Sequence, residues 1–187
     1  MSYDLYSYSS PSAIPDVAEA RGLVDSFNAD EEEGRTRETV AGIKEKIAAA
    51  LTEHNSRLQP FRFDHAAIAK AQNITEREAR AQYQHIELNP PDDDLAIQLT
   101  VYGDHVFITV PYGYRGSEAD QVFSQLSNYL KVIRRAAGFF VYDPQTDKAF
   151  DPEQATPFDR REYERIVRNL PWIIATGLPT KQWWKFW

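Results

Sequence analysis

The segment from Leu95 to Val110 most constrains the fold, because it predicts a β-hairpin with a fixed register. Two runs of alternating apolar residues are separated by Gly103-Asp104, a two-residue turn in which glycine supplies the positive φ. Pairing Tyr102 with His105 places every apolar side chain of both strands on one face, and a shift by one residue would destroy this. The other face is amphipathic and carries Gln98, Thr100, Tyr102, His105, Phe107 and Thr109.

Strands and helices alternate along the rest of the chain. Further strands are expected at 3–8, 85–88 and 139–142, and helices at 15–27, 36–53, 65–71, 75–83, 118–136 and 158–169. Antiparallel strands with helices on one face make an α+β sandwich, so we predict this fold class. A ferredoxin-like split βαβ is the most economical topology. The second face of such a sheet would be free of helices.

The chain length of 187 residues suits one domain. We expect residues 1–150 to form the α+β domain, with a helical insertion at about 36–83. Residues 151–187 would add a C-terminal helix and an aromatic tail, both packed on the same domain.

The composition favours a protein partner over nucleic acid. The net charge is −7, whereas a phosphate backbone is bound by Lys and Arg side chains. An acidic chain suits a basic protein partner, including a toxin domain. No cysteine is present, which excludes disulfides, thiolate metal sites and a cysteine nucleophile. The chain shows no secretion signal and no apolar run long enough to span a membrane, so we expect a cytoplasmic protein with no membrane partner.

Two histidines are candidates for catalysis or metal binding. His85 and Glu87 lie two residues apart on a predicted strand, so their side chains point to the same face. With His105 they suggest an enzyme or a metal-binding protein as an alternative function. Nothing in the spacing fixes a third ligand, and phosphate-loop and serine-nucleophile motifs are absent. We therefore favour a structural role for these residues, and predict no catalytic residue, cofactor or metal.

Two acidic runs, residues 30–33 and Asp92, Asp93 and Asp94, are interpreted as solvated loops. A calcium loop would need alternating oxygen ligands and a glycine at its sixth position, and neither run has these. Their negative charge remains available to a basic partner.

The two short helices predicted at 65–71 and 75–83 raise a further alternative, because they resemble a helix-turn-helix that binds DNA. The second helix is close to charge balance, with Glu76, Arg77, Glu78 and Arg80, inside an acidic domain. A helical hairpin packed for structural reasons is therefore favoured.

The chain ends in KQWWKFW, which contains Trp183, Trp184 and Trp187. Seven residues with two lysines bury too little to anchor a protein in a membrane. Two readings remain, a hook that inserts into a partner and a lid over the free face of the sheet. We favour the lid.

Two motifs, MSYDLYSY at the start of the chain and GFFVYDPQTDKAF at 138–150, carry a resemblance. They are similar to those of a loose group of small bacterial proteins that open with a Tyr-Asp-Leu-Tyr strand and close on an aromatic strand followed by Asp-Pro-Gln. Many of these are hypothetical proteins, and some look like immunity proteins encoded beside polymorphic interbacterial toxins. The resemblance implies no catalytic residue.

The leading hypothesis is a non-enzymatic immunity protein that neutralises a toxin by occluding its active site. Acidity, the lack of catalytic motifs, the amphipathic sheet face and the resemblance motivate it. The residues expected to contact the partner are Asp92, Asp93, Asp94, Tyr102, His105, Phe107, Trp183, Trp184 and Trp187.

Overall fold

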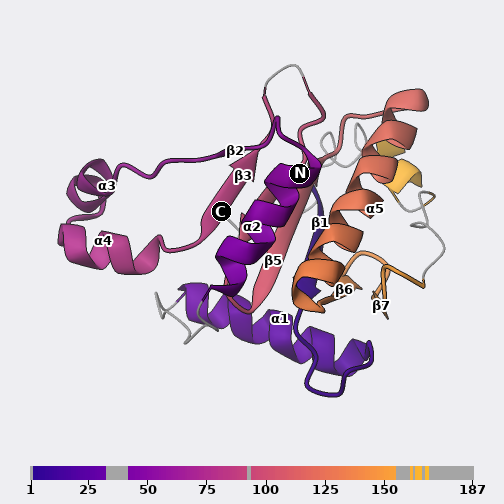
Figure 1. Ribbon diagram of the computed structural model, residues 1–187, viewed down its shortest axis with the longest axis horizontal. Helices are drawn as coiled ribbons and strands as arrows, with labels where there is room; N and C mark the ends of the chain where they lie inside the picture. Colours follow the sequence, from indigo (N-terminus) through magenta and orange to yellow (C-terminus); the bar gives the residue numbers. More distant parts are fainter. Residues whose placement is uncertain are drawn as a thin grey trace.

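The computed structural model describes residues 2–32, 42–91, 94–154, 161, 163–165 and 167–168. A seven-stranded antiparallel sheet in the order β2-β3-β4-β5-β1-β6-β7 forms its centre (Figure 1). The strands are β1 (Ser2–Tyr8), β2 (Gln59–Pro60), β3 (Ile86–Asn89), β4 (Gln98–Val101), β5 (His105–Pro111), β6 (Phe140–Asp143) and β7 (Lys148–Phe150). Helices with described bounds are α1 (Val17–Glu32), α2 (Ile43–His54), α3 (His65–Gln72), α4 (Glu76–Gln82) and α5 (Ser117–Ala137). The fold class is α+β, as predicted.

The β4–β5 hairpin has the predicted register. Leu99 pairs with Ile108, and Val101 pairs with Val106. All four side chains are buried in one core, because alternate residues of a strand share a face of the sheet. The hairpin prediction is confirmed, and the two strands lie in the interior of the sheet.

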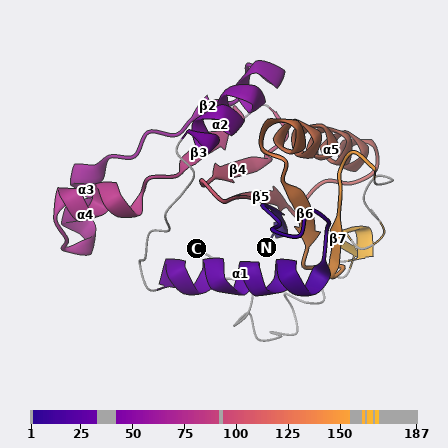
Figure 2. The ribbon, with the colours of Figure 1, turned by 60° about the horizontal axis from the view of Figure 1, so that its bottom comes forward.

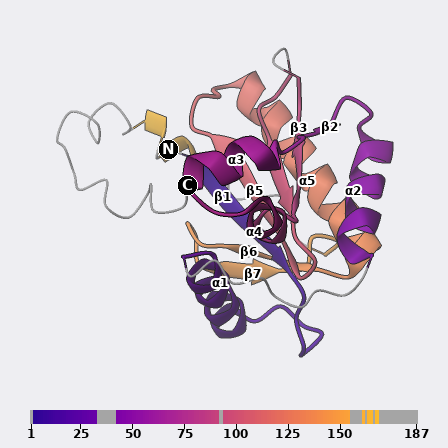
Figure 3. The same ribbon diagram turned by 90° about the vertical axis from the view of Figure 1, so that its left-hand side faces the viewer.

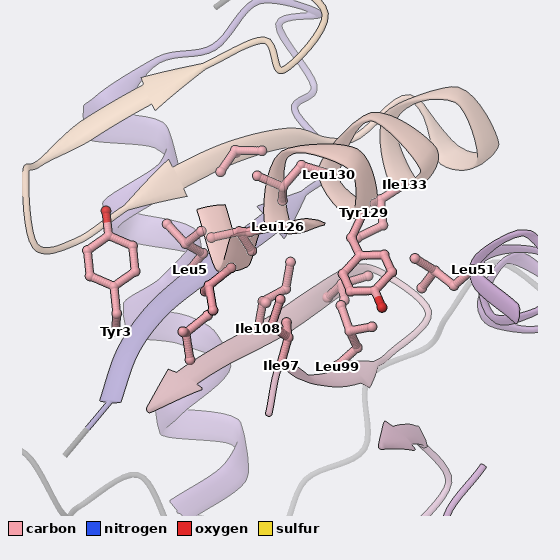
Figure 4. Close-up of a cluster of buried hydrophobic side chains, with 14 of the residues drawn as sticks. Tyr3, Leu5, Leu51, Ile97, Leu99, Ile108, Leu126, Tyr129, Leu130 and Ile133 are labelled. Atoms are coloured by element: carbon pink, nitrogen blue, oxygen red, sulfur yellow. The ribbon is translucent and has the colours of Figure 1, made fainter. Parts of the chain in front are cut away.

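One face of the sheet, here called the core face, is covered by α2 and α5. Figure 4 shows their aliphatic side chains packed against those of β1 and β5. The amphipathic α5 contributes Leu126, Leu130 and Ile133, while α2 contributes Leu51. Tyr163, from the region predicted as the C-terminal helix, is fully buried in the same core.

The prediction that the helices lie on one face is wrong for α1, which packs on the opposite, outer face (Figure 2). Val24 and Phe27 of α1 meet Tyr6 of β1 and Tyr142 of β6 in a second apolar cluster. The apolar stripe of α1 needs an apolar surface to cover, and the aromatic residues of β1 and β6 supply one on this side.

The strand order extends beyond the predicted topology. β4, β5, β1 and β6 lie side by side, with α2 and α5 on the core face, which is compatible with a split βαβ unit. β2 lengthens the sheet at one edge and β7 at the other, and the alternation of apolar residues predicts neither as a strand. The ferredoxin-like assignment stays a prediction.

The bounds of α1 differ from those predicted at both ends. The helix begins at Val17 because Asp16 Oδ1 accepts a hydrogen bond from the Glu19 amide at 2.8 Å and caps the first turn. It continues to Glu32, through residues that the sequence suggests as the start of an acidic loop. The predicted start of the next helix, at 36, lies outside the described residues.

Residues 61–84 form an arm, in which α3 and α4 pack on each other. Figure 1 shows the arm projecting from the sheet edge at β2 and β3, and Figure 3, viewed from its side, shows it in front of the sheet. Both helices of the arm have an N-terminal cap: Asp64 accepts from a backbone amide of α3, and Thr75 and Glu78 form a capping box at the start of α4. These local signals start each short helix of the arm.

Candidate functional site

A row of aromatic rings crosses the outer face of the sheet. Ile86 pairs with Val101, which places His85 beside Tyr102, and the Tyr102 amide donates to the His105 carbonyl at 2.9 Å. The ring centroids of His85 and Tyr102 are 5.1 Å apart, and those of Tyr102 and His105 are 4.3 Å apart and nearly parallel. The three rings therefore form a continuous row, in which Tyr102 and His105 are stacked and the His85 ring is tilted by 37° from that of Tyr102.

Helix α1 covers one end of this row. The Phe27 ring stacks on His105 with a centroid distance of 3.9 Å, and His105 is 8% exposed. Phe107 lies beside Tyr6 at 5.0 Å and packs against the α1 cluster. Of the three hairpin residues expected to contact a partner, His105 therefore has little free surface, and Tyr102 and Phe107 are half-buried.

The base of the arm closes the other end of the row. Phe63 contacts His85 edge-on at 4.9 Å, and Tyr83 lies 6.0 Å from His85 and 5.4 Å from Phe63. We call the connected set Phe27, His105, Tyr102, His85 and Phe63 the aromatic row. It links α1 to the arm across the sheet.

Carboxylates flank the aromatic row. His105 Nδ1 donates to Asp104 Oδ1 at 2.8 Å, a short hydrogen bond that orients the imidazole. His85 Nε2 lies 3.4 Å from Glu87 Oε1, and Gln98 Nε2 donates to Glu87 Oε2 at 3.5 Å. Both contacts of Glu87 are long, so its carboxylate keeps capacity for a stronger donor.

The grouping of His85, Glu87 and His105 into one site is wrong. The Tyr102 ring lies between the two imidazoles, because β4 separates β3 from β5 in the sheet. Nowhere in the described ranges do three His, Cys, Asp or Glu side chains come together in a group that could hold a metal ion. The remaining His85–Glu87 pair supplies too few ligands for a typical zinc site.

Asp4 is a perturbed acid on the outer face that the sequence does not single out. It lies opposite Thr109 on β5, and burial raises the pKa of its carboxyl above the ordinary value. Its Oδ1 is buried and accepts no hydrogen bond from any described residue. Such an acid marks a candidate functional position, although structural sites perturb carboxyls too.

The two motifs that carry the family resemblance meet in space. The Tyr3 hydroxyl donates to Asp143 Oδ2 at 2.5 Å, and the Asp4 amide donates to Gln145 Oε1 at 3.2 Å. Asp143 Oδ1 also accepts from the Gln145 amide at 2.9 Å and shapes the turn that follows β6. These contacts join β1 to the β6–β7 turn, so both motifs have a structural role.

The acidic loop is only partly described. Asp94 forms a salt bridge with Arg57 at 3.3 Å, and its Oδ1 accepts from the Leu95 amide at 2.8 Å. Its charge is therefore partly neutralised. Of the other residues expected to bind a partner, those outside the described residues are Asp92, Asp93, Trp183, Trp184 and Trp187.

Three further aromatic residues belong to the site although no motif in the sequence marks them: Phe27, Phe63 and Tyr83. The sequence indicates the local structure around two of them: Phe27 belongs to the apolar stripe of a helix, and Phe63 lies in an extended segment. Their contacts with His105 and His85 join elements far apart in the chain. No spacing in the sequence could have indicated these pairs.

None of the described helices is long and apolar enough to cross a bilayer. Comparison with known proteins finds no matching family model, no matching curated protein and no matching solved structure. Function is therefore argued from the residues and their contacts.

Proposed function

We propose that this chain is a non-enzymatic protein-binding module, and specifically a cytoplasmic bacterial immunity protein that occludes the active site of a cognate toxin. One observation carries the binding part of the proposal. His85, Glu87 and Tyr102 form a partly buried patch on the outer face, between the part covered by α1 and the base of the arm, and the side chains of His85 and Glu87 are 11% and 21% exposed. We call these three residues the outer patch.

The chemistry of the outer patch fits a cationic side chain from a partner. An arginine guanidinium would pair with the Glu87 carboxylate at the edge of the Tyr102 ring, since the two faces of that ring are covered by His85 and His105. Among the described residues Glu87 makes only long contacts, at 3.4 and 3.5 Å, so a bidentate arginine would be a better donor than either of these neighbours. The net charge of −7 would add long-range attraction for a basic protein.

The immunity role rests on the resemblance of the motifs around Tyr3 and Asp143 and on the acidity of the chain. Toxins that act on nucleic acid carry basic surfaces, and an acidic protein that covers such a surface competes with the substrate. The enzymatic alternative has less support, because Tyr102 separates His85 from His105.

Binding to the product of the adjacent gene tests the proposal. The two proteins would be expressed and purified separately and titrated by calorimetry, with Glu87→Lys and Tyr102→Ala as test variants. Each variant should weaken binding by about tenfold or more, as expected of residues at the centre of an interface. Glu118→Lys is the matched control, since it makes the same charge change at an exposed site on α5.

Two results would overturn the proposal. An adjacent product that does not bind, and whose toxicity in cells is unaffected by this protein, would exclude the immunity role. Binding that Glu87→Lys and Glu118→Lys weaken equally would show that the outer patch is not the contact surface.

A further inference from the structure

A strip of polar residues on the outer face is withdrawn from water. Asp4 pairs with Thr109 and Thr109 pairs with Gln98, so the three lie side by side across β1, β5 and β4. Thr109 is 7% exposed, and Asp4 Oδ1 is buried without a hydrogen bond from any described residue. A sheet face that meets solvent keeps such side chains hydrated. These three residues, here called the polar strip, are therefore expected to lie under a further layer.

The described elements next to the outer face lie away from the polar strip. Within the part of the chain that the structure describes, the apolar side of α1 packs on Tyr6 and Tyr8, further along β1 than Asp4. The arm meets the same face at His85, beside β3, which is two strands away from β5. A cover for the polar strip must therefore come from another segment.

The polar strip and the adjacent outer patch define the chemistry of this cover. Asp4 Oδ1 needs a donor, and Glu87 has only its two long contacts among the described residues. The half-buried rings of Tyr102 and Phe107 supply apolar surface beside these carboxylates. The best complement combines aromatic rings with N–H donors and positive charge, because an indole N–H only donates and an ammonium group pairs with a carboxylate.

Residues 181–187 combine these groups in one short stretch, KQWWKFW. Lys181 and Lys185 are positive, and no acidic side chain accompanies them. The aromatic residues of the stretch are Trp183, Trp184, Phe186 and Trp187, all of which lie outside the described residues. This composition matches the needs of the polar strip and the outer patch.

The last described part of the chain is anchored close to the polar strip. The Tyr163 hydroxyl donates to the Pro111 carbonyl at 2.9 Å, and Pro111 pairs with Ser2, two residues from Asp4. Val167 also packs in the core-face cluster. The chain from there to Lys181 can span up to about 45 Å. Passing the sheet takes about 10 Å, and crossing from β1 to β3 takes about 15 Å. Residues 181–187 can therefore reach the outer face of their own chain.

We infer that residues 181–187 cover the polar strip and the outer patch of the same chain, with a lysine paired to Glu87 and an indole N–H donating to Asp4 Oδ1. This inference gives the lid predicted from the sequence a defined site. A partner that takes the outer patch must then displace the lid. The contact itself involves one chain alone, so the inference does not rest on the proposed toxin partner.

Acrylamide quenching of tryptophan fluorescence tests the inference in the full chain. Trp172→Phe removes the one tryptophan outside the lid, so that the emission comes from Trp183, Trp184 and Trp187. The quenching constant should be about threefold or more below that of the same protein in concentrated guanidinium chloride, because rings packed on the sheet are shielded.

A charge reversal at the proposed contact should release the lid. In the Trp172→Phe background, Glu87→Lys should raise the quenching constant by about twofold or more, because it repels the lysines of the lid. Glu118→Lys makes the same charge change at an exposed site on α5 and should leave the constant unchanged. Circular dichroism would verify that each variant is folded.

Thermal unfolding gives a second measurement that does not depend on Trp172→Phe. Trp184→Ala in the otherwise unchanged chain should lower Tm by about 3 °C or more, since it removes apolar burial on the outer face. Ile14→Ala is the control, because it removes a large apolar side chain that is exposed, and it should leave Tm unchanged.

Quenching as strong as in the unfolded chain would overturn the inference, and so would equal effects of Glu87→Lys and Glu118→Lys. Shielding that is lost on dilution would overturn it in favour of a second copy as the site of docking. Shielding that appears only when the adjacent gene product is added would overturn it in favour of a hook for that partner. The titration of the adjacent product bears on the proposed function alone.

Discussion

The two faces of the central sheet are covered in different ways. The core face lies under α2 and α5 and is filled with aliphatic side chains such as Ile108 and Leu126. The outer face is covered by α1 at one end and contacted by Phe63 and Tyr83 at the base of the arm, and it combines aromatic rings with the carboxylates of Glu87 and Asp4. One face thus maximises apolar burial, whereas the other combines polar groups with rings that are buried or partly exposed.

Two neighbouring residues of β5 allow the contributions of the two faces to stability to be compared directly. Ile108 is fully buried on the core face, and Phe107 is half-buried on the outer face. Ile108→Ala should lower the free energy of unfolding by about 2–5 kcal/mol, since it removes apolar contacts and leaves a cavity. Phe107→Ala should cost only about 1–2 kcal/mol, because part of its ring is already in water. Urea unfolding measures both, and equal losses would show that the two faces contribute alike.

The buried carboxylates of the two faces offer a second comparison. Asp143, on the core face, accepts hydrogen bonds from Tyr3 and from the turn that follows it. Tyr3→Phe removes one of these bonds and should lower the free energy of unfolding by about 1–3 kcal/mol. Tyr83→Phe is the control, because the Tyr83 hydroxyl contacts only the exposed Gln72 among the described side chains. Its loss should lower the free energy of unfolding by less than about 0.5 kcal/mol. Similar losses from both variants would contradict a structural role for the Tyr3–Asp143 bond.

Replacing Asp4, on the outer face, should raise stability rather than lower it, and the effect should be the smallest of those predicted. Burial raises the pKa of its carboxyl, so the ionised form is destabilising in the folded state. The folded protein then binds the proton more tightly than the unfolded chain, and stability falls as the pH rises through the folded pKa. Asp4→Asn should therefore raise Tm by a few degrees or less at pH 7, with a smaller gain at about pH 4, near the ordinary carboxyl value.

Thermal unfolding of Asp4→Asn and of the exposed Asp25→Asn across this pH range makes the measurement. A gain that is the same at both pH values would show that ionisation of Asp4 is not the cause. A loss of stability at pH 7 would indicate that the Asp4 carboxylate is stabilised by interactions that outweigh its burial.

Local patterns predicted much of the fold correctly. The Gly103-Asp104 turn and the alternation around it determine the register of β4 and β5, and both signals act within a few residues. The capping box of Thr75 and Glu78 likewise begins α4, and Gly138, with a φ of 76°, ends α5. These elements were predictable because their physical causes are contained in short segments.

The position of α1 could not be predicted in the same way. Its apolar stripe, which includes Val24 and Phe27, shows that one side is buried but carries no information on which sheet face it meets. The acidic residues that follow suggest a loop, yet the helix continues to Glu32. The sequence therefore predicts an outer face free of helices, whereas α1 covers part of it. As a result His105 is far less accessible than its position in the sequence suggests.

The sequence by itself determined the α+β class, the hairpin register, most helix ends and the absence of cysteine chemistry. Only the tertiary structure decided that Tyr102 separates His85 from His105, that Phe27 covers one end of the row, and that the arm stands apart from the body. The reason is physical: turns, caps and periodicity are short-range, whereas ring stacking and burial depend on which distant strands and helices become neighbours.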